Sequence, residues 1–286
     1  MHPIKDLAIV LRSIRYEERH RIVTALTEHH GVISALAKNS IQSRRFGATL
    51  ESFVASDWIM THKPGAELAF LTEAQIRHSF AELSQDFDKF SLASVFSELL
   101  LRMPPRGDAC PALFRLHCNA LSSLASMPSG DTSSVYRLTL LNTYLGKLLQ
   151  WSGSQPSLHQ CFQCKTPLEQ ISQDAYVHAK IADGGWICSS CFSENPKHSA
   201  LKLSPKVLLD FQVSLRVPIR QAVQRFGTSI QEQRSFFQFL ESFYAYHVPG
   251  FDQNPLKSLR FLESTLPLEA KYHTQTPPDP AATDSQ

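Results

Sequence analysis

Glycine is scarce in this chain, with 11 in 286 residues, and this scarcity narrows the possible functions. The glycines form none of the clustered loops that cradle phosphate, such as a Walker-type loop or a dinucleotide-binding turn. A Gly-x-Ser-x-Gly nucleophile elbow and a His-Glu-x-x-His metalloprotease motif are also missing. Because no residue pattern points to a reaction, we predict that the protein is not an enzyme.

Long apolar runs are also missing. No stretch approaches the roughly 20 residues that a membrane helix needs, and residues 1–6 lack the basic-then-apolar pattern of a signal peptide. The composition, 43% hydrophobic and 19% charged, is typical of a globular protein with a substantial core. We therefore expect a cytoplasmic protein without membrane contact.

Cysteine is rare too, but four of the six cysteines form two Cys-x-x-Cys pairs. The first pair is Cys161 and Cys164, and the second is Cys188 and Cys191. Two such pairs flanking a short segment can present four thiolates to one tetrahedral metal ion. The spacing predicts a zinc ribbon with one structural zinc per chain, since four protein ligands leave no open position for water or substrate. Four ordinary buried cysteines are the alternative.

The remaining cysteines and the nearby histidines have simpler interpretations. Cys110 and Cys118 lie eight residues apart in a helical stretch, which indicates one buried helix face. His159 and His178 are close enough to be substitute ligands, but with four thiolates available we expect both to be surface residues. Reduced thiols and a bound metal are consistent with an intracellular location.

Residues 5 to about 73 have the pattern of β-strands. Short apolar and partly β-branched runs alternate with turn signals, and no helical period lies between them. The expected strands are 7–11, 22–27, 31–37, 53–60 and 68–71. Five short strands indicate a small barrel, most simply an OB-fold, with an SH3-like barrel as the alternative.

From about residue 79 the apolar period becomes helical. The expected helices run from about 79 to 103, from about 111 to 126, from Asp131 or Thr132 to beyond Leu148, from Ser204-Pro205 onward, and over about 230–247. The fold class is therefore α+β. We expect an OB-fold domain over 1–78, an all-α domain over 79–262 with the zinc ribbon inserted at about 158–195, and a mostly disordered, proline-rich tail over 263–286.

Basic residues gather in the expected barrel, where residues 12–45 contain seven basic and three acidic side chains. The basic residues are Arg12, Arg15, Arg19, Arg21, Lys38, Arg44 and Arg45. Such a surface can follow a phosphate backbone, and Tyr16, Phe46 and Trp58 are candidates to stack on bases. A solvated charged surface is the alternative. Residues 161–194 contain two basic and four acidic residues, so the ribbon is not expected to be the primary nucleic-acid contact.

The order of several short blocks resembles the RecO family of bacterial recombination mediators. The resemblance spans about residues 5–262, and its specificity lies in the ordered series more than in any single block. The four cysteines sit where many members carry a zinc motif, and the last block is similar to a closing Leu-Lys-Ser segment. The blocks are Leu11–Glu18, Ile22-Val23, Thr27–Gly31, Arg44–Gly47, Leu50–Phe53, Leu71–Ala74 and Leu256–Leu262.

The resemblance implies a DNA repair function. Members of the family bind single- and double-stranded DNA, anneal complementary strands and, with RecR, help load RecA onto DNA coated by single-strand binding protein. The residues that carry over as DNA contacts are Arg12, Arg15, Lys38, Arg44 and Arg45. The sequence departs from the family's usual pattern at Asn39, where a glycine is common, and at His20, where an acidic residue is common.

The resemblance also implies partner surfaces and a nucleoid-associated location. RecR is expected to meet the barrel, and the acidic C-terminal tail of single-strand binding protein is expected in a basic-rimmed apolar groove among the helices. Arg216, Arg220 and Lys257 belong to a second basic set and are the candidates for that groove. The alternative function is a protein-interaction scaffold with a structural zinc and only incidental DNA contact.

Overall fold

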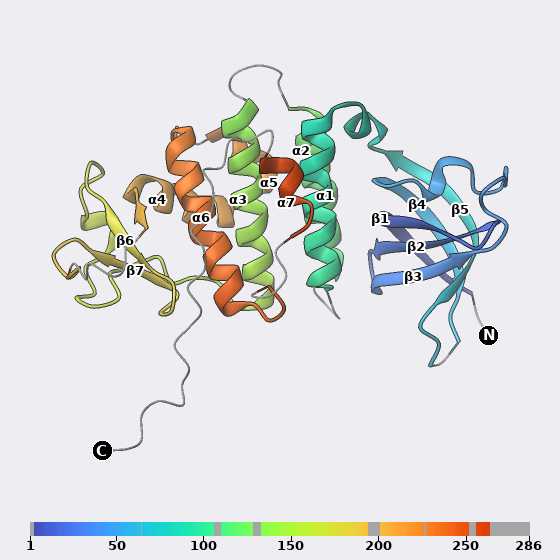
Figure 1. Ribbon diagram of the computed structural model, residues 1–286, viewed down its shortest axis with the longest axis horizontal. Helices are drawn as coiled ribbons and strands as arrows, with labels where there is room; N and C mark the ends of the chain where they lie inside the picture. Colours follow the sequence, from blue (N-terminus) through green and yellow to red (C-terminus); the bar gives the residue numbers. More distant parts are fainter. Residues whose placement is uncertain are drawn as a thin grey trace.

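Five strands close into a barrel in which β1 pairs with both β2 and β4 (Figure 1). The computed structural model describes residues 3–63, 65–105, 110–127, 133–193, 201–225, 227–251 and 256–263. The strands are β1 (Ile4–Tyr16), β2 (His20–Thr27), β3 (Gly31–Ala37), β4 (Val54–Thr61) and β5 (Ala69–Ser79). Their order is β1-β2-β3-β5-β4, and only the β3–β5 pairing is parallel. This OB-like barrel, followed by helices, confirms the predicted fold class.

Two strands are longer than their apolar runs. β1 was expected over 7–11 and β5 over 68–71, but β1 extends to Tyr16 and β5 to Ser79. The polar extension of β1 pairs residue by residue with β2, as at Arg15 and Arg21. The polar extension of β5 pairs with β4 in the same way. Backbone pairing with a neighbour therefore continues these strands after their apolar pattern has ended.

Seven helices lie in the described residues that follow the barrel. They are α1 (Phe87–Arg102), α2 (Cys110–Ala125), α3 (Ser133–Ser152), α4 (Pro205–Arg216), α5 (Ile219–Arg225), α6 (Ile230–His247) and α7 (Leu259–Glu263). Three-residue to five-residue 3₁₀ turns lie at η1 (Gly47–Leu50), η2 (Ala81–Gln85) and η4 (Leu168–Gln170). The predicted Asp131 or Thr132 cap, and the tail from 264, lie outside the described residues.

The first helix begins later than the apolar period indicated. A helix was expected from about 79, but residues 81–85 form η2 and α1 starts at Phe87. The Asp86 carboxylate caps α1 by accepting the N–H groups of Asp88 and Lys89. α4 begins as predicted, with Ser204 at its N-cap and Pro205 in its first turn.

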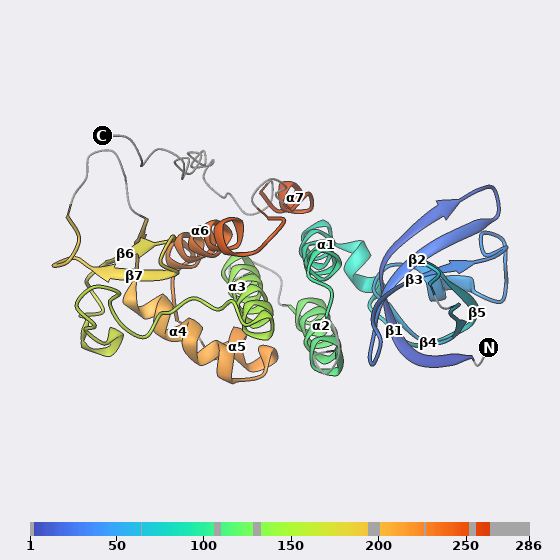
Figure 2. The same ribbon diagram turned by 90° about the horizontal axis from the view of Figure 1, so that it is seen from below.

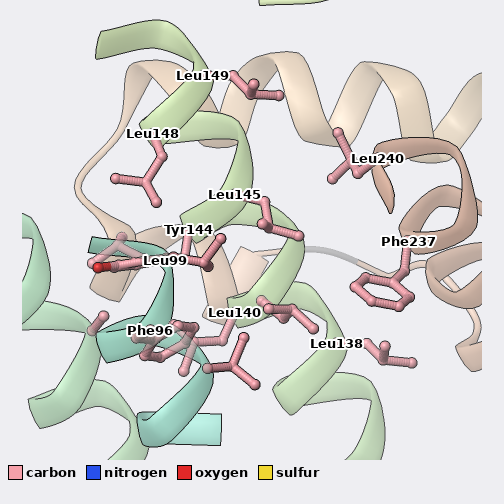
Figure 3. Packing of buried hydrophobic residues seen from close by; sticks show 14 of the residues in the cluster. Phe96, Leu99, Leu138, Leu140, Tyr144, Leu145, Leu148, Leu149, Phe237 and Leu240 are labelled. Carbon is pink, nitrogen blue, oxygen red and sulfur yellow. The ribbon is translucent and has the colours of Figure 1, made fainter. Parts of the chain in front are cut away.

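One hydrophobic core joins the barrel, the helices and the ribbon. Its centre is α3, where fully buried Tyr144 stacks on Phe96 of α1 (Figure 3). The same cluster contains Ile9 of the barrel and Trp186 of the ribbon. A separate cluster fills the inside of the barrel. The shared core holds the barrel and the cysteine cluster at opposite ends of the helical layer (Figure 1).

The cysteine segment folds as a small three-stranded sheet. Its strands are β6 (Val177–Lys180), β7 (Gly185–Cys188) and β8 (Lys202–Leu203), in the order β7-β6-β8.

None of the helices in the described part of the chain is both long enough and apolar enough to cross a membrane.

Candidate nucleic-acid interface and metal centre

The four predicted ligands come together at one point of the ribbon. The sulfur atoms of Cys161, Cys164, Cys188 and Cys191 all lie within 4.8 Å of one another. Cys161 and Cys188 are buried, and a backbone turn at Lys165, with φ +62°, follows the first pair. None of the four is in a disulfide. This cluster is a closed four-thiol set that fits a tetrahedral metal ion.

The clustered thiols shift one another's pKa values because their sulfur atoms are in contact. A hydrogen bond with the Thr166 hydroxyl, 3.1 Å from Cys164 Sγ, lowers the pKa of Cys164 to about 6. Contacts with the sulfur atoms of Cys188 and Cys164 raise the pKa of Cys191 to about 12. Four thiolates this close are stable together only when a bound cation offsets their repulsion. The donor set therefore fits zinc.

The ribbon is tied to the helices by specific contacts. The indole N–H of buried Trp186 donates to the Leu158 carbonyl at 2.9 Å, and the Gln212 side chain of α4 donates to the same carbonyl at 3.0 Å. His247 of α6 lies 2.6 Å from the Ile181 carbonyl. Damage to the metal centre is therefore expected to reach the helical core.

The two histidines near the cysteines behave differently from each other. His159 is exposed, as predicted. The prediction of a surface position for His178 is wrong, because His178 is buried and stacks on Phe192 with 3.8 Å between ring centroids. Its position on β6, where it pairs with Ile187 of β7, makes it part of the ribbon's packing. Neither histidine belongs to the group of four thiols.

Five of the predicted basic residues lie at one end of the barrel, which we call the basic end. The members are Arg15, Arg19, Lys38, Arg44 and Arg45, and all five are exposed. The loop after β3 meets the β1–β2 turn, where the Ile41 N–H donates to the Arg19 carbonyl at 3.3 Å. Among the described residues, no acidic side chain forms an ion pair with any of the five. Their charges are therefore free for a phosphate ligand.

The loop after β3 is held by the two residues that depart from the family pattern. Asn39 has φ +51°, a left-handed conformation that glycine adopts freely and asparagine tolerates. Its N–H donates to His20 Nδ1 at 2.9 Å. Asparagine thus keeps the backbone turn that glycine usually provides, and His20 connects the loop to β2.

The other two predicted DNA contacts have different surroundings. Arg21 is half-buried and forms a 2.8 Å ion pair with Glu51, so its charge is already matched. Arg12 is exposed, but it follows a bulge in β1 and lines a groove between the barrel and the helices. Neither belongs to the basic end.

The prediction that Phe46 and Trp58 stack on bases is wrong. Both point into the barrel core, where Phe46 is 1% exposed and Trp58 is fully buried. For Trp58 of β4, the inward and outward positions cannot be separated until the strand register is known. Phe46 lies in the loop before η1, which folds over the barrel core. Tyr16 is 42% exposed and remains available. Sequence reasoning missed Phe70 of β5, whose ring lies 5.1 Å from Lys38 Nζ.

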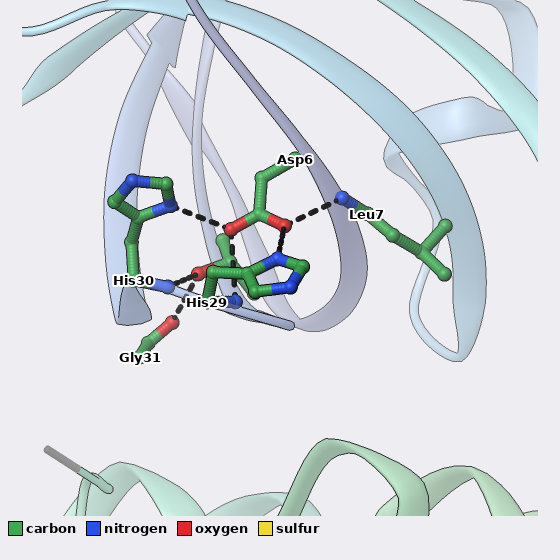
Figure 4. A network of polar contacts seen from close by, with 6 residues as sticks. Asp6, Leu7, His29, His30 and Gly31 are labelled. Carbon is green, nitrogen blue, oxygen red and sulfur yellow. Dashed lines mark hydrogen bonds and ion pairs between the residues drawn. The ribbon is translucent and has the colours of Figure 1, made fainter. Parts of the chain in front are cut away.

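A polar network fixes the barrel where it faces the helices (Figure 4). The buried Asp6 carboxylate contacts His29 Nδ1 at 2.9 Å and His30 Nδ1 at 2.6 Å. It also accepts the N–H groups of Leu7 and His29. Burial alone would raise the pKa of Asp6, but the hydrogen bonds with both histidines lower it, and the contact with Asp6 raises the pKa of His29. The two adjacent histidines of the β2–β3 turn therefore contribute to this network, which their sequence pattern did not indicate.

The groove beside Arg12 contains one of the predicted partner-binding residues. It has a volume of about 560 Å³ and lies between β1, the end of α1, residues 249–251 and Lys257. Arg12, Arg102 and Lys257 are its basic residues, and Leu101 and Phe251 are apolar. The groove also contains Glu98, which forms a 2.8 Å ion pair with Arg102. Arg216 and Arg220 are exposed at the junction of α4 and α5, which lies on the opposite side of the helical layer from α7 (Figure 2). The three predicted residues are therefore not brought together.

Comparisons with known proteins agree on one family. The family profile described as "Recombination protein O N terminal" matches residues 1–80, and "Recombination protein O C terminal" matches residues 84–260. The chain is 31% identical to the DNA repair protein RecO of Desulfatibacillum aliphaticivorans, over 92% of this chain and 97% of that protein. It is 30% identical to the RecO protein of Desulfosudis oleivorans, over 90% of this chain and 95% of that protein. It is also 30% identical to the RecO protein of Bacillus pumilus, over 71% of this chain and 73% of that protein.

Proposed function

This chain belongs to the RecO family of DNA repair proteins, and we propose that it is a non-enzymatic recombination mediator that binds DNA and anneals complementary strands. The observation that carries the proposal is the basic end, where five exposed cations gather on an OB-like barrel and form no ion pair with an acidic side chain in the described part of the chain. OB-fold barrels commonly bind single strands through such a surface. We also propose that the chain has two domains, the barrel over residues 1–78 and the helical domain with its ribbon over residues 79–262.

The mechanism that we propose is charge neutralisation. Two complementary strands repel each other, and a surface that binds both phosphate backbones lowers this repulsion while the bases find their register. Release of counterions drives such binding, so the affinity falls steeply with salt. No bond is made or broken in this step, and a catalytic group is not required.

The metal centre supports this function indirectly. We propose one structural zinc held by the four cysteines, where it stabilises the ribbon and, through Trp186 and the contacts of α4 and α6, the helical core. Metal analysis should give one zinc per chain that is released only on unfolding. A metal that exchanges freely in the folded protein, or thiols that cycle under mild oxidant, would favour an enzyme instead.

Partner proteins complete the proposal. We propose that RecR contacts the barrel and that, with it, the protein helps load RecA onto DNA coated by single-strand binding protein. The groove that contains Arg12, Arg102 and Lys257 is the site that we propose for the acidic tail of single-strand binding protein. Glu98 of the groove already pairs with Arg102, so Arg12 and Lys257 are the cations that would meet the tail, beside the apolar Leu101 and Phe251. Annealing should then be faster on DNA coated with the intact protein than with a tail-truncated form, and Lys257→Ala should reduce that difference. Equal rates on both would rule out tail docking.

Strand annealing with two labelled oligonucleotides is the experiment that tests the central proposal. We expect the protein to accelerate annealing at least tenfold at low salt, with the acceleration fading as salt rises. The rival function, a protein-interaction scaffold with incidental DNA contact, predicts annealing at the spontaneous rate at every salt concentration.

A further inference from the structure

A second group of metal-ligating side chains lies on the barrel. One carboxylate oxygen each of Asp6 and Glu28 and a ring nitrogen of His29 all lie within 4.8 Å of one another. Asp6 belongs to β1, while Glu28 and His29 lie in the turn between β2 and β3. In Figure 4 the Asp6 carboxylate lies between the rings of His29 and His30. Two carboxylates and an imidazole are ligand types that divalent transition metals accept.

The spacing of these atoms matches an octahedral metal shell. Asp6 Oδ1 and His29 Nδ1 are 2.9 Å apart. Neighbouring ligands of an octahedral ion with bonds of about 2.1 Å are about 3.0 Å apart, whereas the same bonds in a tetrahedral shell place them about 3.4 Å apart. An ion can therefore replace the proton that Asp6 shares with His29 with little movement of either side chain.

The charges of the group also favour a cation. The side chain of Asp6 is 1% exposed, and Glu28 is partly exposed. In the described part of the chain, the Glu28 carboxylate has no hydrogen-bond or ion-pair partner. The protons that Asp6 shares with His29 and His30 leave Glu28 unmatched, whereas one divalent ion offsets both carboxylates.

Hydrogen bonds hold the ligand-bearing turn in place before any ion binds. The Glu28 N–H donates to the Leu7 carbonyl at 2.9 Å, which ties the turn to β1. The hydroxyl of Thr27 accepts the His30 N–H at 3.1 Å. His30 Nδ1 lies 2.6 Å from Asp6 Oδ2 and orients the carboxylate, as outer-shell partners do in metal sites. The three ligand residues are therefore preorganised.

From these observations we propose that Asp6, Glu28 and His29 bind one divalent transition-metal ion in an octahedral site, with water in the remaining positions. Carboxylates and imidazole are harder ligands than thiolates, so this site takes ions such as Ni²⁺, Co²⁺ or Mn²⁺, while the cysteine cluster selects zinc. The ion joins β1 to the β2–β3 turn and stabilises the barrel where it faces the helices. This inference does not depend on the proposed DNA function.

Binding of Ni²⁺ to the tag-free, zinc-loaded protein tests the site. Dialysis against a chelator first removes ions from exposed sites, while the zinc enclosed by the cysteines stays in the folded protein. Calorimetric titration at pH 7.5 should then give one Ni²⁺ per chain, and saturating Ni²⁺ should raise the Tm by about 5 °C. In the variant Glu28→Gln/His29→Gln, the affinity for Ni²⁺ should fall about 100-fold and the rise in Tm should disappear.

A matched control separates this site from ordinary surface histidines. His78 is an exposed histidine of β5 outside the ligand group, so His78→Gln should bind Ni²⁺ as the wild type does. Equal affinities of the wild type and the double variant, equal losses in the double variant and His78→Gln, or no binding by the wild type would each overturn the inference. Thermal unfolding without added metal checks that each variant is folded.

Co²⁺ provides a second measurement, because its visible absorption reports the geometry and the ligands. An octahedral ion with oxygen and nitrogen ligands absorbs weakly, and this weak band should be missing in the folded double variant. Strong absorption with a thiolate charge-transfer band would place the ion in the cysteine cluster and would contradict the proposed site.

Discussion

In the ribbon, the four cysteines turn toward one another, whereas at the basic end of the barrel the cations turn toward solvent. The sulfur atoms of the four cysteines lie within 4.8 Å of one another. The basic residues Arg15, Arg19, Lys38, Arg44 and Arg45 have no acidic partner among the described residues. This difference separates the proposed structural metal site from the proposed DNA-binding site.

The largest expected effect comes from breaking the metal centre. Cys161→Ser removes a buried ligand, and because metal binding and folding are coupled, we expect the Tm to fall by about 10 °C or more. DNA binding should decline only as far as the folded fraction declines. Cys118→Ala, which changes a cysteine outside the cluster, should lose no zinc. A Cys161→Ser protein that is fully folded but does not bind DNA would reverse the roles assigned to the two regions.

A smaller effect is expected from the Asp6 network of the barrel, in which a buried carboxylate is hydrogen-bonded by His29, His30 and backbone N–H groups. Its lowered pKa gives Asp6 a stabilising contribution above its ordinary value of 3.8, which is lost as pH falls through the lowered pKa. The raised pKa of His29 gives a contribution present below 6.5 and lost as pH rises through the raised value. Asp6→Asn should therefore lower the Tm by about 5 °C at pH 5.5 and by less at pH 8.

Thermal unfolding across pH measures this effect. Asp174→Asn, at an exposed aspartate of the ribbon segment, should leave the Tm unchanged at both pH values. A Tm difference between wild type and Asp6→Asn that does not vary with pH would mean that charge plays no part in the network.

The smallest effect is expected at Asp210 of α4, a polar group that the fold leaves unsatisfied. Burial raises its pKa to about 6, and its Oδ2 has no hydrogen-bond partner among the residues that the structure describes. The stabilising contribution of the protonated Asp210 carboxyl is therefore fully present below pH 3.8 and is lost as the pH rises through about 6. Asp210→Asn should raise the Tm by about 2 °C at pH 7.5 and leave it unchanged at pH 4. A lower Tm for the variant at pH 7.5 would show that the carboxylate has a compensating partner.

The parts that could be predicted from sequence are those set by local spacing. Two Cys-x-x-Cys pairs predict the candidate ligand set because each pair forms one turn. Ser204-Pro205 predicts a helix start because serine is a common N-cap and proline suits the first helical turn. The barrel was recognisable from its five apolar runs. The ends of β1 and β5 were not, because pairing with β2 and β4 carries these strands beyond their apolar residues.

The parts that could not be predicted depend on register and on distant partners. A one-residue difference decides whether a strand residue points in or out, so Trp58 was taken for a surface residue although it fills the barrel. Phe70 was overlooked because only the pairing of β3 with β5 brings its ring beside Lys38. The ion pair of Arg21 with Glu51 joins residues 30 positions apart, which local spacing does not reveal.

The salt dependence of binding to a single strand tests the assignment of function to the barrel most directly. The variant Lys38→Ala/Arg44→Ala/Arg45→Ala should reduce the log–log slope by about 2, since each neutralised phosphate contributes about 0.7 on single strands. Lys165→Ala/Lys180→Ala/Lys202→Ala, which removes the same charge from the ribbon region, should leave the slope within about 0.5 of the wild-type value. Equal slopes for both variants, or a larger change in the ribbon variant, would contradict the account.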